Sequence, residues 1–136
     1  LPLQLSWTTV KRGSSSHAAE HILISAAVTI TGADTAEMGG ISYPDGSVVI
    51  YDGAYGGSGL ARLLYERMEK DFQRGSEMLA ACKCGRVDGC PKCTYSPYCG
   101  NNNKYLWKDG ALETLRRILK GNRTRIDAKP VGRSTV

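Results

Sequence analysis

The feature that most constrains how this chain folds is a dense group of cysteines. All five cysteines of the 136-residue sequence lie between residues 82 and 99. From Cys84 onward they follow the spacing C-x5-C-x2-C-x5-C, which suits four thiolates in a tetrahedral shell around Zn²⁺. A disulfide framework fits less well, because the number of cysteines is odd and no signal peptide is visible in the sequence. The segment therefore predicts a structural zinc loop.

The fifth cysteine leaves the identity of the first ligand open. Cys82 and Cys84 are two residues apart, and either could reach the metal. Cys84 is favoured because a glycine follows it, as a glycine follows Cys99, and glycine suits the turns around such a site. Cys82 closes a helical run, where a buried free thiol is the simpler expectation. The predicted ligands are Cys84, Cys90, Cys93 and Cys99, with Cys82 as the alternative to Cys84.

Composition places the chain among ordinary soluble domains. Hydrophobic residues make up 41% and charged residues 23%, and 136 residues suffice for one domain with its own core. No apolar run approaches the ~20 residues of a membrane span. Clustered reduced cysteines without a targeting segment favour the cytoplasm, either near the nucleoid or, in a eukaryote, in the nucleus. The start at Leu1, without a methionine, suggests a piece of a longer polypeptide.

Positive charge is concentrated near the C-terminus. The net charge is +5, and from Lys104 onward nine basic residues stand against three acidic ones. Such a patch can neutralise phosphates, and Lys104, Arg116 and Arg117 are its candidate contacts. The alternative is a solvated helix face followed by a tail. Residues 122–136 are polar and without apolar periodicity, so we expect a domain over 1–121 and a disordered basic tail after it.

Periodicity predicts a mixed α/β fold with a small hairpin, flanking helices and the zinc loop. Alternation over 3–10 predicts a strand, and an apolar stripe over 18–27, capped by Ser16, predicts a helix. Two short strands flank the turn Pro44-Asp45-Gly46. The remaining expected helices cover 60–75, 76–82 with Ser76 as its cap, and 109–120 between Asp109 and Gly121.

A glycine-rich loop joins the hairpin to the following helix. Gly56, Gly57 and Gly59 lie at the start of that helix, where backbone N–H groups can hold an anion such as a phosphate. The loop lacks the Gly-Lys-Ser/Thr of a P-loop and the spacing of GxGxxG. Close packing of the loop against the sheet is the competing explanation.

A second short motif combines two histidines and a glutamate. His17-Ala-Ala-Glu20-His21 has the order H-x-x-E-H, in which two histidines one helical turn apart bind zinc and the glutamate acts as base. Such a hydrolase also needs a third ligand, and nothing downstream in the sequence specifies one. Hydrogen bonding of these side chains to neighbouring loops is the simpler interpretation.

Several motifs together resemble one known domain. They are Ala18-Ala-Glu-His21, Gly39-Gly-Ile-Ser42, Ile50-Tyr-Asp-Gly53, Gly89-Cys-Pro-Lys-Cys93 and Ser96-Pro-Tyr-Cys-Gly-Asn101. In this order they are similar to the C-terminal zinc-binding domain of DEAD/DEAH-box DNA helicases of the MrfA and Hrq (RecQ-like) type. The likeness extends from about residue 3 to about residue 119.

The resemblance implies a structural four-cysteine zinc site in a domain attached to an ATP-driven 3′-to-5′ DNA helicase of superfamily 2 that acts in DNA repair. The chain itself carries no Walker A motif and no DEAD/DEAH box, so no catalytic site is assigned to it. The motor, with its ATP, is then expected upstream in the same polypeptide or in a partner. Related domains also occur in other DNA-processing and defence proteins, so a purely structural or protein-interaction role in such a complex is the alternative.

The zinc loop also suggests how the domain meets DNA. Lys83, Arg86 and Lys92 lie close to the thiolates in sequence and can offset their charge. Basic and aromatic residues interleave there, as in sites that steer phosphates and stack bases of a single strand. The candidate contacts to single-stranded DNA are Lys92, Tyr95, Tyr98, Lys104, Arg116 and Arg117. Trp107 is expected to pack inside the domain.

Overall fold

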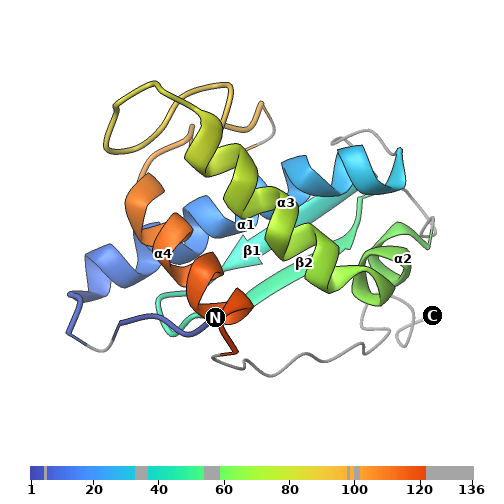
Figure 1. Cartoon of the computed structure of the whole chain (residues 1–136), viewed down its shortest axis with the longest axis horizontal. Coiled ribbons are helices and arrows are strands. Elements are labelled where there is room, and N and C mark those ends of the chain that lie inside the picture. Colours follow the sequence, from blue (N-terminus) through green and yellow to red (C-terminus); the bar gives the residue numbers. More distant parts are fainter. Residues whose placement is uncertain (5, 33–36, 54–58, 98, 100–101, 122–136) are drawn as a thin grey trace.

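The computed structural model describes residues 1–4, 6–32, 37–53, 59–97, 99 and 102–121. Four helices and an antiparallel hairpin make up this part of the chain (Figure 1). The mixed α/β architecture predicted from the sequence is confirmed. In chain order the elements are α1 Thr9–Thr31, β1 Met38–Ser42, β2 Val48–Asp52, α2 Leu60–Glu66, α3 Met68–Ala81 and α4 Lys108–Leu119.

Helix α1 is the element around which the others assemble. It contacts α2, α3, α4 and both strands, and Figure 1 shows α3 and α4 crossing it. Its buried positions are mostly small, which lets neighbouring backbones approach closely. They include Ser14, Ser15, Ser16, Ala18, Ala19, Ala26 and Ala27, with Ile22 and Leu23 filling the space between them.

Two glycines on the crossing helices make this close approach possible. A Cβ added to Gly75 of α3 would lie 3.3 Å from Leu115 of α4 and 3.6 Å from Ile22 of α1. A Cβ at Gly110 of α4 would lie 2.1 Å from the hydroxyl of Ser15. The three helices therefore meet where side chains are absent, and Gly75 belongs to the core rather than to a helix end.

The hairpin forms where the sequence predicts it. Met38 pairs with Asp52 and Ser42 with Val48, and Gly46 completes the turn with φ 97°. One face packs towards α1, with Ile50 against the core. The other face carries exposed apolar side chains at Ile41, Tyr43, Val49 and Tyr51.

The predicted strand over 3–10 is wrong. Helix α1 begins at Thr9, and the hydroxyl of Thr8 accepts a hydrogen bond from the backbone N–H of Lys11 at 3.2 Å. This cap satisfies a free donor of the first turn and outweighs the β-branched composition of the segment. Ser16, predicted to be the cap, is instead buried inside the helix. Residues 1–4 and 6–8 contain no strand.

The helix boundaries after the hairpin also differ. The expected helix 60–75 is divided at Arg67, whose φ of −119° and ψ of 25° interrupt the helical path. Helix α3 then continues through Gly75 to Ala81, so the predicted stop at Gly75 and the new start at Ser76 are wrong. Helix α4 begins at Lys108, one residue before the expected Asp109 cap.

A long loop, residues 82–107, joins α3 to α4 and carries every cysteine of the chain. It leaves the end of α3 and returns to the start of α4 (Figure 1). None of the described helices is long and apolar enough to cross a membrane. The predicted tail, residues 122–136, lies outside the described residues.

A buried carboxylate stands out in the core. Asp71 of α3 is fully buried, and neither carboxylate oxygen has a hydrogen-bond partner among the described residues. Burial raises the pKa of this carboxyl to about 8. Because that pKa lies above the ~3.9 of an unfolded aspartate, stability contributed by the protonated group is complete below pH ~4 and is lost as the pH rises through 8.

We therefore expect Asp71→Asn to raise the free energy of unfolding, with a gain over the wild type that grows by ~1.4 kcal/mol per pH unit between pH 5 and 8. Denaturant unfolding of both proteins across this range measures the difference. Glu77→Gln, an exposed change on the same helix, is the control and should show no such trend. A gain in the free energy of unfolding that is independent of pH would contradict the raised pKa of Asp71.

Candidate metal centre

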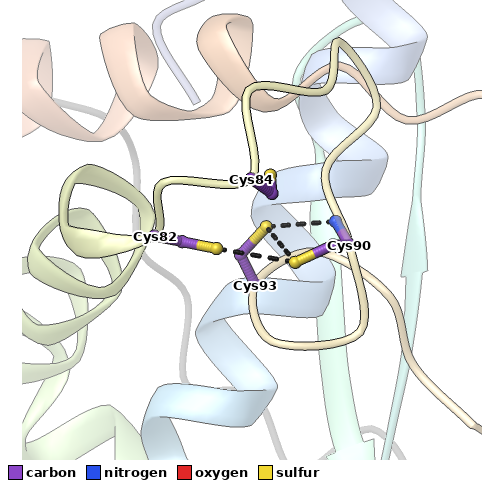
Figure 2. A group of neighbouring side chains, drawn as sticks. All are labelled: Cys82, Cys84, Cys90 and Cys93. Carbon is purple, nitrogen blue, oxygen red and sulfur yellow. Dashed lines mark hydrogen bonds between the residues drawn. The ribbon is translucent and has the colours of Figure 1, made fainter.

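Four cysteines gather at the end of α3. Cys82 is the C-cap of that helix, with its backbone N–H donating to the carbonyl of Met78, and Cys84, Cys90 and Cys93 come from the loop that follows. Their Sγ atoms all lie within 4.8 Å of one another. Figure 2 shows the four side chains gathered at one place beside the translucent helices.

The spacing of the sulfurs fits a tetrahedral zinc site. A tetrahedron with Zn–S bonds of ~2.3 Å has sulfur–sulfur edges of ~3.8 Å. The Sγ atoms of Cys90 and Cys93 are 3.8 Å apart, and those of Cys82 and Cys90 are 3.5 Å apart. Four thiolates are also a soft donor set that selects Zn²⁺ over hard cations. The arrangement can therefore hold a zinc ion with little movement of the side chains.

The turn from Cys90 to Cys93 is shaped to support the sulfurs. The backbone N–H of Cys90 lies 3.2 Å from the Sγ of Cys93, and the N–H of Lys92 lies 3.4 Å from the Sγ of Cys90. The N–H of Cys93 also donates to the carbonyl of Cys90 at 3.0 Å. These donors favour the negatively charged thiolate over the neutral thiol.

The cysteines that the structure brings together differ from the ligand set predicted from the sequence. That set included Cys99 and kept Cys82 only as an alternative to Cys84. Cys82 and Cys84 instead both belong to the cluster, and Cys99 lies with His17 and His21. The Sγ of Cys82, at the C-cap of α3, lies 3.5 Å from the Sγ of Cys90, whereas the Sγ of Cys99 lies 3.5 Å from the Nε2 of His17 on α1.

Lys108 supplies the positive charge nearest to the sulfurs. Its ammonium group donates to the carbonyl of Cys82 at 2.7 Å and lies 3.5 Å from the Sγ of Cys84. The residue is buried, with 7% of its surface exposed. Four thiolates and one Zn²⁺ carry a net charge of −2, so a buried cation beside them offsets a large desolvation cost.

Sequence reasoning missed Lys108, although its position as the first residue of a helix after the cysteines was a usable signal. Burial by itself lowers the pKa of the Lys108 ammonium, but the thiolates of Cys93, Cys84 and Cys82 outweigh it and raise the pKa above its usual value. The lysines expected near the thiolates, Lys83 and Lys92, are exposed instead.

Two thiols of the cluster differ in acidity. A hydrogen bond from the backbone of Arg86 lowers the pKa of the Cys84 thiol to about 7. Burial raises the pKa of the Cys93 thiol to about 11. Because a coordinating thiol is deprotonated outright, metal binding at this cluster is coupled to proton release from Cys93.

Tyr95 and Arg86 belong to the scaffold of the loop. The hydroxyl of Tyr95 donates to the carboxylate of Asp88 at 2.5 Å and accepts from the guanidinium of Arg86 at 2.9 Å. Arg86 also forms an ion pair with Asp88 at 3.6 Å and lies over the Tyr95 ring. Both residues, predicted to meet DNA or the thiolates, therefore have partners within the loop.

The other predicted DNA contacts differ in exposure. Lys92, Lys104 and Arg116 are exposed, Arg117 is half-buried, and Tyr98 lies outside the described residues. Trp107 packs edge-on against Trp7 with ring centroids 4.8 Å apart, as expected of a residue that packs inside the domain.

The site predicted for an anion already holds a carboxylate of the protein. The backbone N–H of Gly59 donates to Asp52 at 3.1 Å, and the N–H of Ala61 donates to the same carboxylate at 2.9 Å. Asp52 therefore caps α2 from the end of the hairpin. Gly56 and Gly57 lie outside the described residues.

The H-x-x-E-H motif forms a second group of side chains. His17 and His21 of α1 lie with Cys99, their possible ligand atoms within 4.8 Å of one another. These residues and Glu20 line a pocket of about 550 Å³. Burial lowers the pKa of His21 to about 4 and raises that of Glu20 to about 7. Cys99 thus supplies a possible third ligand for the H-x-x-E-H motif, which the sequence did not identify.

We expect Cys82→Ser to remove the four-sulfur shell, and with it the cooperative melting of the domain, because three thiolates hold zinc far less tightly. Cys99→Ser should leave the four-sulfur shell intact. Absorption of the Co²⁺-substituted protein measures the number of thiolate ligands, and thermal melting measures the fold. The opposite result, with Cys99→Ser losing the four-thiolate spectrum, would restore the ligand set inferred from spacing.

We also expect Lys108→Met to weaken zinc binding by about 10- to 100-fold, the usual effect of losing a group that supports metal ligands. Competition with a chromophoric chelator measures the affinity. Lys104→Met removes the same charge from an exposed position four residues away and is the matched control. Equal affinities of the two variants would show that the charge of Lys108 is not needed at the site.

Comparisons with known proteins agree with this geometry. Residues 19–94 match the family model of the MrfA Zn-binding domain, a span that contains the four-cysteine cluster and leaves Cys99 outside. An uncharacterized protein of Methanocaldococcus jannaschii is 42% identical over 112 residues, covering 76% of this chain and 98% of that protein.

The fold is also similar to part of the crystal structure of the DUF1998 helicase MrfA bound to DNA. The TM-score is 0.65 at 19% sequence identity, over 85% of this chain. The chain spans about 15% of that helicase. The similarity therefore concerns one domain of a much larger protein.

The family match covers more than half of the chain, and the span that it matches contains four cysteines whose Sγ atoms lie within 4.8 Å of one another. The chain belongs to the MrfA Zn-binding domain family, and its zinc site is structural.

Proposed function

We propose that this chain is a zinc-stabilised accessory domain of a DEAD/DEAH-box DNA helicase of superfamily 2, and that it supports DNA binding and unwinding in DNA repair. The observation that carries the proposal is the pairing of a four-cysteine cluster with exposed lysines on the same loop, in a domain of this family. Catalysis is assigned to a motor outside the described residues, where ATP is bound and hydrolysed.

The sizes of the relatives are compatible with two places for the motor. A similar fold fills about 15% of a DNA-bound helicase, whereas the relative from Methanocaldococcus jannaschii is covered over 98% of its length. A protein consisting of little more than this domain therefore exists. The proposal accordingly includes a motor in a separate chain as well as one in the same polypeptide, and the cytoplasm as the compartment where they meet DNA.

The loop supports the proposal through the positions of its charges. Lys83 and Lys92 each adjoin a cysteine of the cluster and are exposed, so a bound metal fixes their backbone. Lys104 is exposed further along the loop. Fixed cations suit phosphates, because little side-chain and backbone freedom is lost when they bind.

Aromatic stacking has a smaller part in this proposal than the sequence suggested. Tyr95 makes two hydrogen bonds inside the loop and lies under Arg86. Binding through phosphates, without base stacking at Tyr95, predicts little sequence preference and strong salt dependence. Single-stranded DNA is the proposed ligand.

The test is binding of a fluorescein-labelled single strand to the full chain, followed by anisotropy at several salt concentrations. We expect the triple change Lys83→Ala, Lys92→Ala and Lys104→Ala to weaken binding. The dependence of log K on log salt should also become flatter, by ~0.7 for each phosphate that the variant no longer neutralises. The variant should keep the zinc content and melting temperature of the wild type.

Lys70→Ala, which removes an exposed lysine from α3, is the matched control and should leave the salt slope unchanged. Absence of salt-dependent binding by the wild type would overturn direct DNA contact. It would favour the alternative, a structural or protein-interaction domain in another DNA-processing or defence complex.

A further inference from the structure

A second group of metal-ligating side chains lies outside the four-cysteine cluster. His17 and His21 project from α1 one turn apart, with ring centroids 4.4 Å apart, and Cys99 reaches them from the loop between α3 and α4. The Nε2 of His17 is 3.5 Å from the Sγ of Cys99. Two potential ligands from one helix and a third from a distant loop therefore lie within 4.8 Å of one another.

Both histidines are held in the orientation that metal ligation requires. The Nδ1 of His17 lies 3.1 Å from the carbonyl oxygen of Tyr105, and the Nδ1 of His21 lies 2.6 Å from that of Thr94. A carbonyl can only accept, so each Nδ1 carries the proton and each Nε2 keeps a free lone pair. Histidine ligands of metals almost always donate their other ring N–H in this way.

The loop that carries Cys99 is fixed at both ends by the same contacts. The Nδ1 of His21 contacts the carbonyl of Thr94 and the Nδ1 of His17 contacts that of Tyr105, so the loop is tied to α1 at both of these residues. Within it, Asn103 accepts from the N–H of Ser96 at 2.7 Å and donates to its carbonyl at 3.0 Å. Cys99 therefore belongs to a loop that is tied to α1 on either side of it.

The distances suit a small transition metal ion. With Zn–N bonds of ~2.0 Å and a Zn–S bond of ~2.3 Å, a tetrahedral site places N and S donors ~3.5 Å apart. The observed separation of His17 and Cys99 matches this value, and the remaining pairs need to close from at most 4.8 Å. A thiolate with two imidazoles is a donor set that zinc and cobalt accept.

We propose that His17, His21 and Cys99 form a second metal site that binds a divalent transition metal ion, Zn²⁺ in the first instance. All three residues line the pocket of about 550 Å³. Three protein ligands leave the fourth coordination position to water or to another oxygen donor from the pocket. The site therefore differs from the closed four-sulfur centre in both ligands and access.

The experiment is a titration of the metal-free, fully reduced chain with Co²⁺, followed by visible absorption and by native mass spectrometry. We expect two ions per chain. Cys99→Ser should weaken the second ion by at least about 10-fold, by analogy with the loss of supporting groups, while the four-thiolate bands of the first ion stay unchanged. Ser25→Ala, a change in the same pocket, is the matched control and should keep both ions.

A measurement on the wild type alone covers the case in which a variant does not fold. Nuclear magnetic resonance of the ¹¹³Cd-loaded protein should give two signals, one from a site of four sulfurs and one from a site of mixed nitrogen and sulfur. A single ion per chain, or two ions retained at full affinity by Cys99→Ser, would overturn the proposal. Neither result would affect the DNA-binding proposal, which depends on exposed lysines.

Discussion

The convergence of four thiols at the end of α3 is the constraint on which the rest of the structure depends. The loop of residues 82–107 contains no helix or strand among its described residues, so its shape depends on the contacts at the cluster. Lys108 connects those contacts to the next helix. Its ammonium meets Cys82 and Cys84, and its backbone N–H donates to the carbonyl of Val87 at 2.9 Å. One residue thus places a positive charge beside the sulfurs and also begins α4.

Helix α1 gives this loop a surface to rest on. Small buried side chains bring α3 and α4 close to it, while its histidines hold the loop where it passes by. Thr94 adjoins Cys93 of the first cluster, and its carbonyl is the partner of His21 in the second. The backbone of Thr94 therefore links the four-cysteine cluster to His21 of the second group.

The sequence predicted the general architecture, the hairpin and the zinc loop, because each has a local signature in turn residues or cysteine spacing. The predictions were wrong where tertiary contacts, rather than local sequence, determine where a helix begins or ends. Gly75 resembles a helix end in the sequence, but it lies where α1 and α4 pack so closely against α3 that there is little room for a side chain. The segment 3–10 alternates like a strand, yet the Thr8 cap and the edge-on packing of Trp7 against Trp107 favour the start of a helix at Thr9. Spacing alone could not place Cys82 in the cluster and Cys99 outside it, because both choices give four sulfurs. Only the tertiary contacts separate them, with Cys82 beside Cys90 and Cys99 beside His17 of α1.

The closeness of the sulfurs also makes the domain sensitive to oxidants. With the Sγ atoms of Cys82 and Cys90 only 3.5 Å apart, oxidation to a disulfide needs little movement and consumes two ligands at once. Cys84 is half-exposed, and in the metal-free loop a hydrogen bond from the backbone of Arg86 lowers the pKa of its thiol, which favours the thiolate, the state in which thiols react. Oxidation of the metal-free loop by peroxide would thus remove two ligands and block zinc binding, and reduction of the disulfide by a dithiol would restore the site.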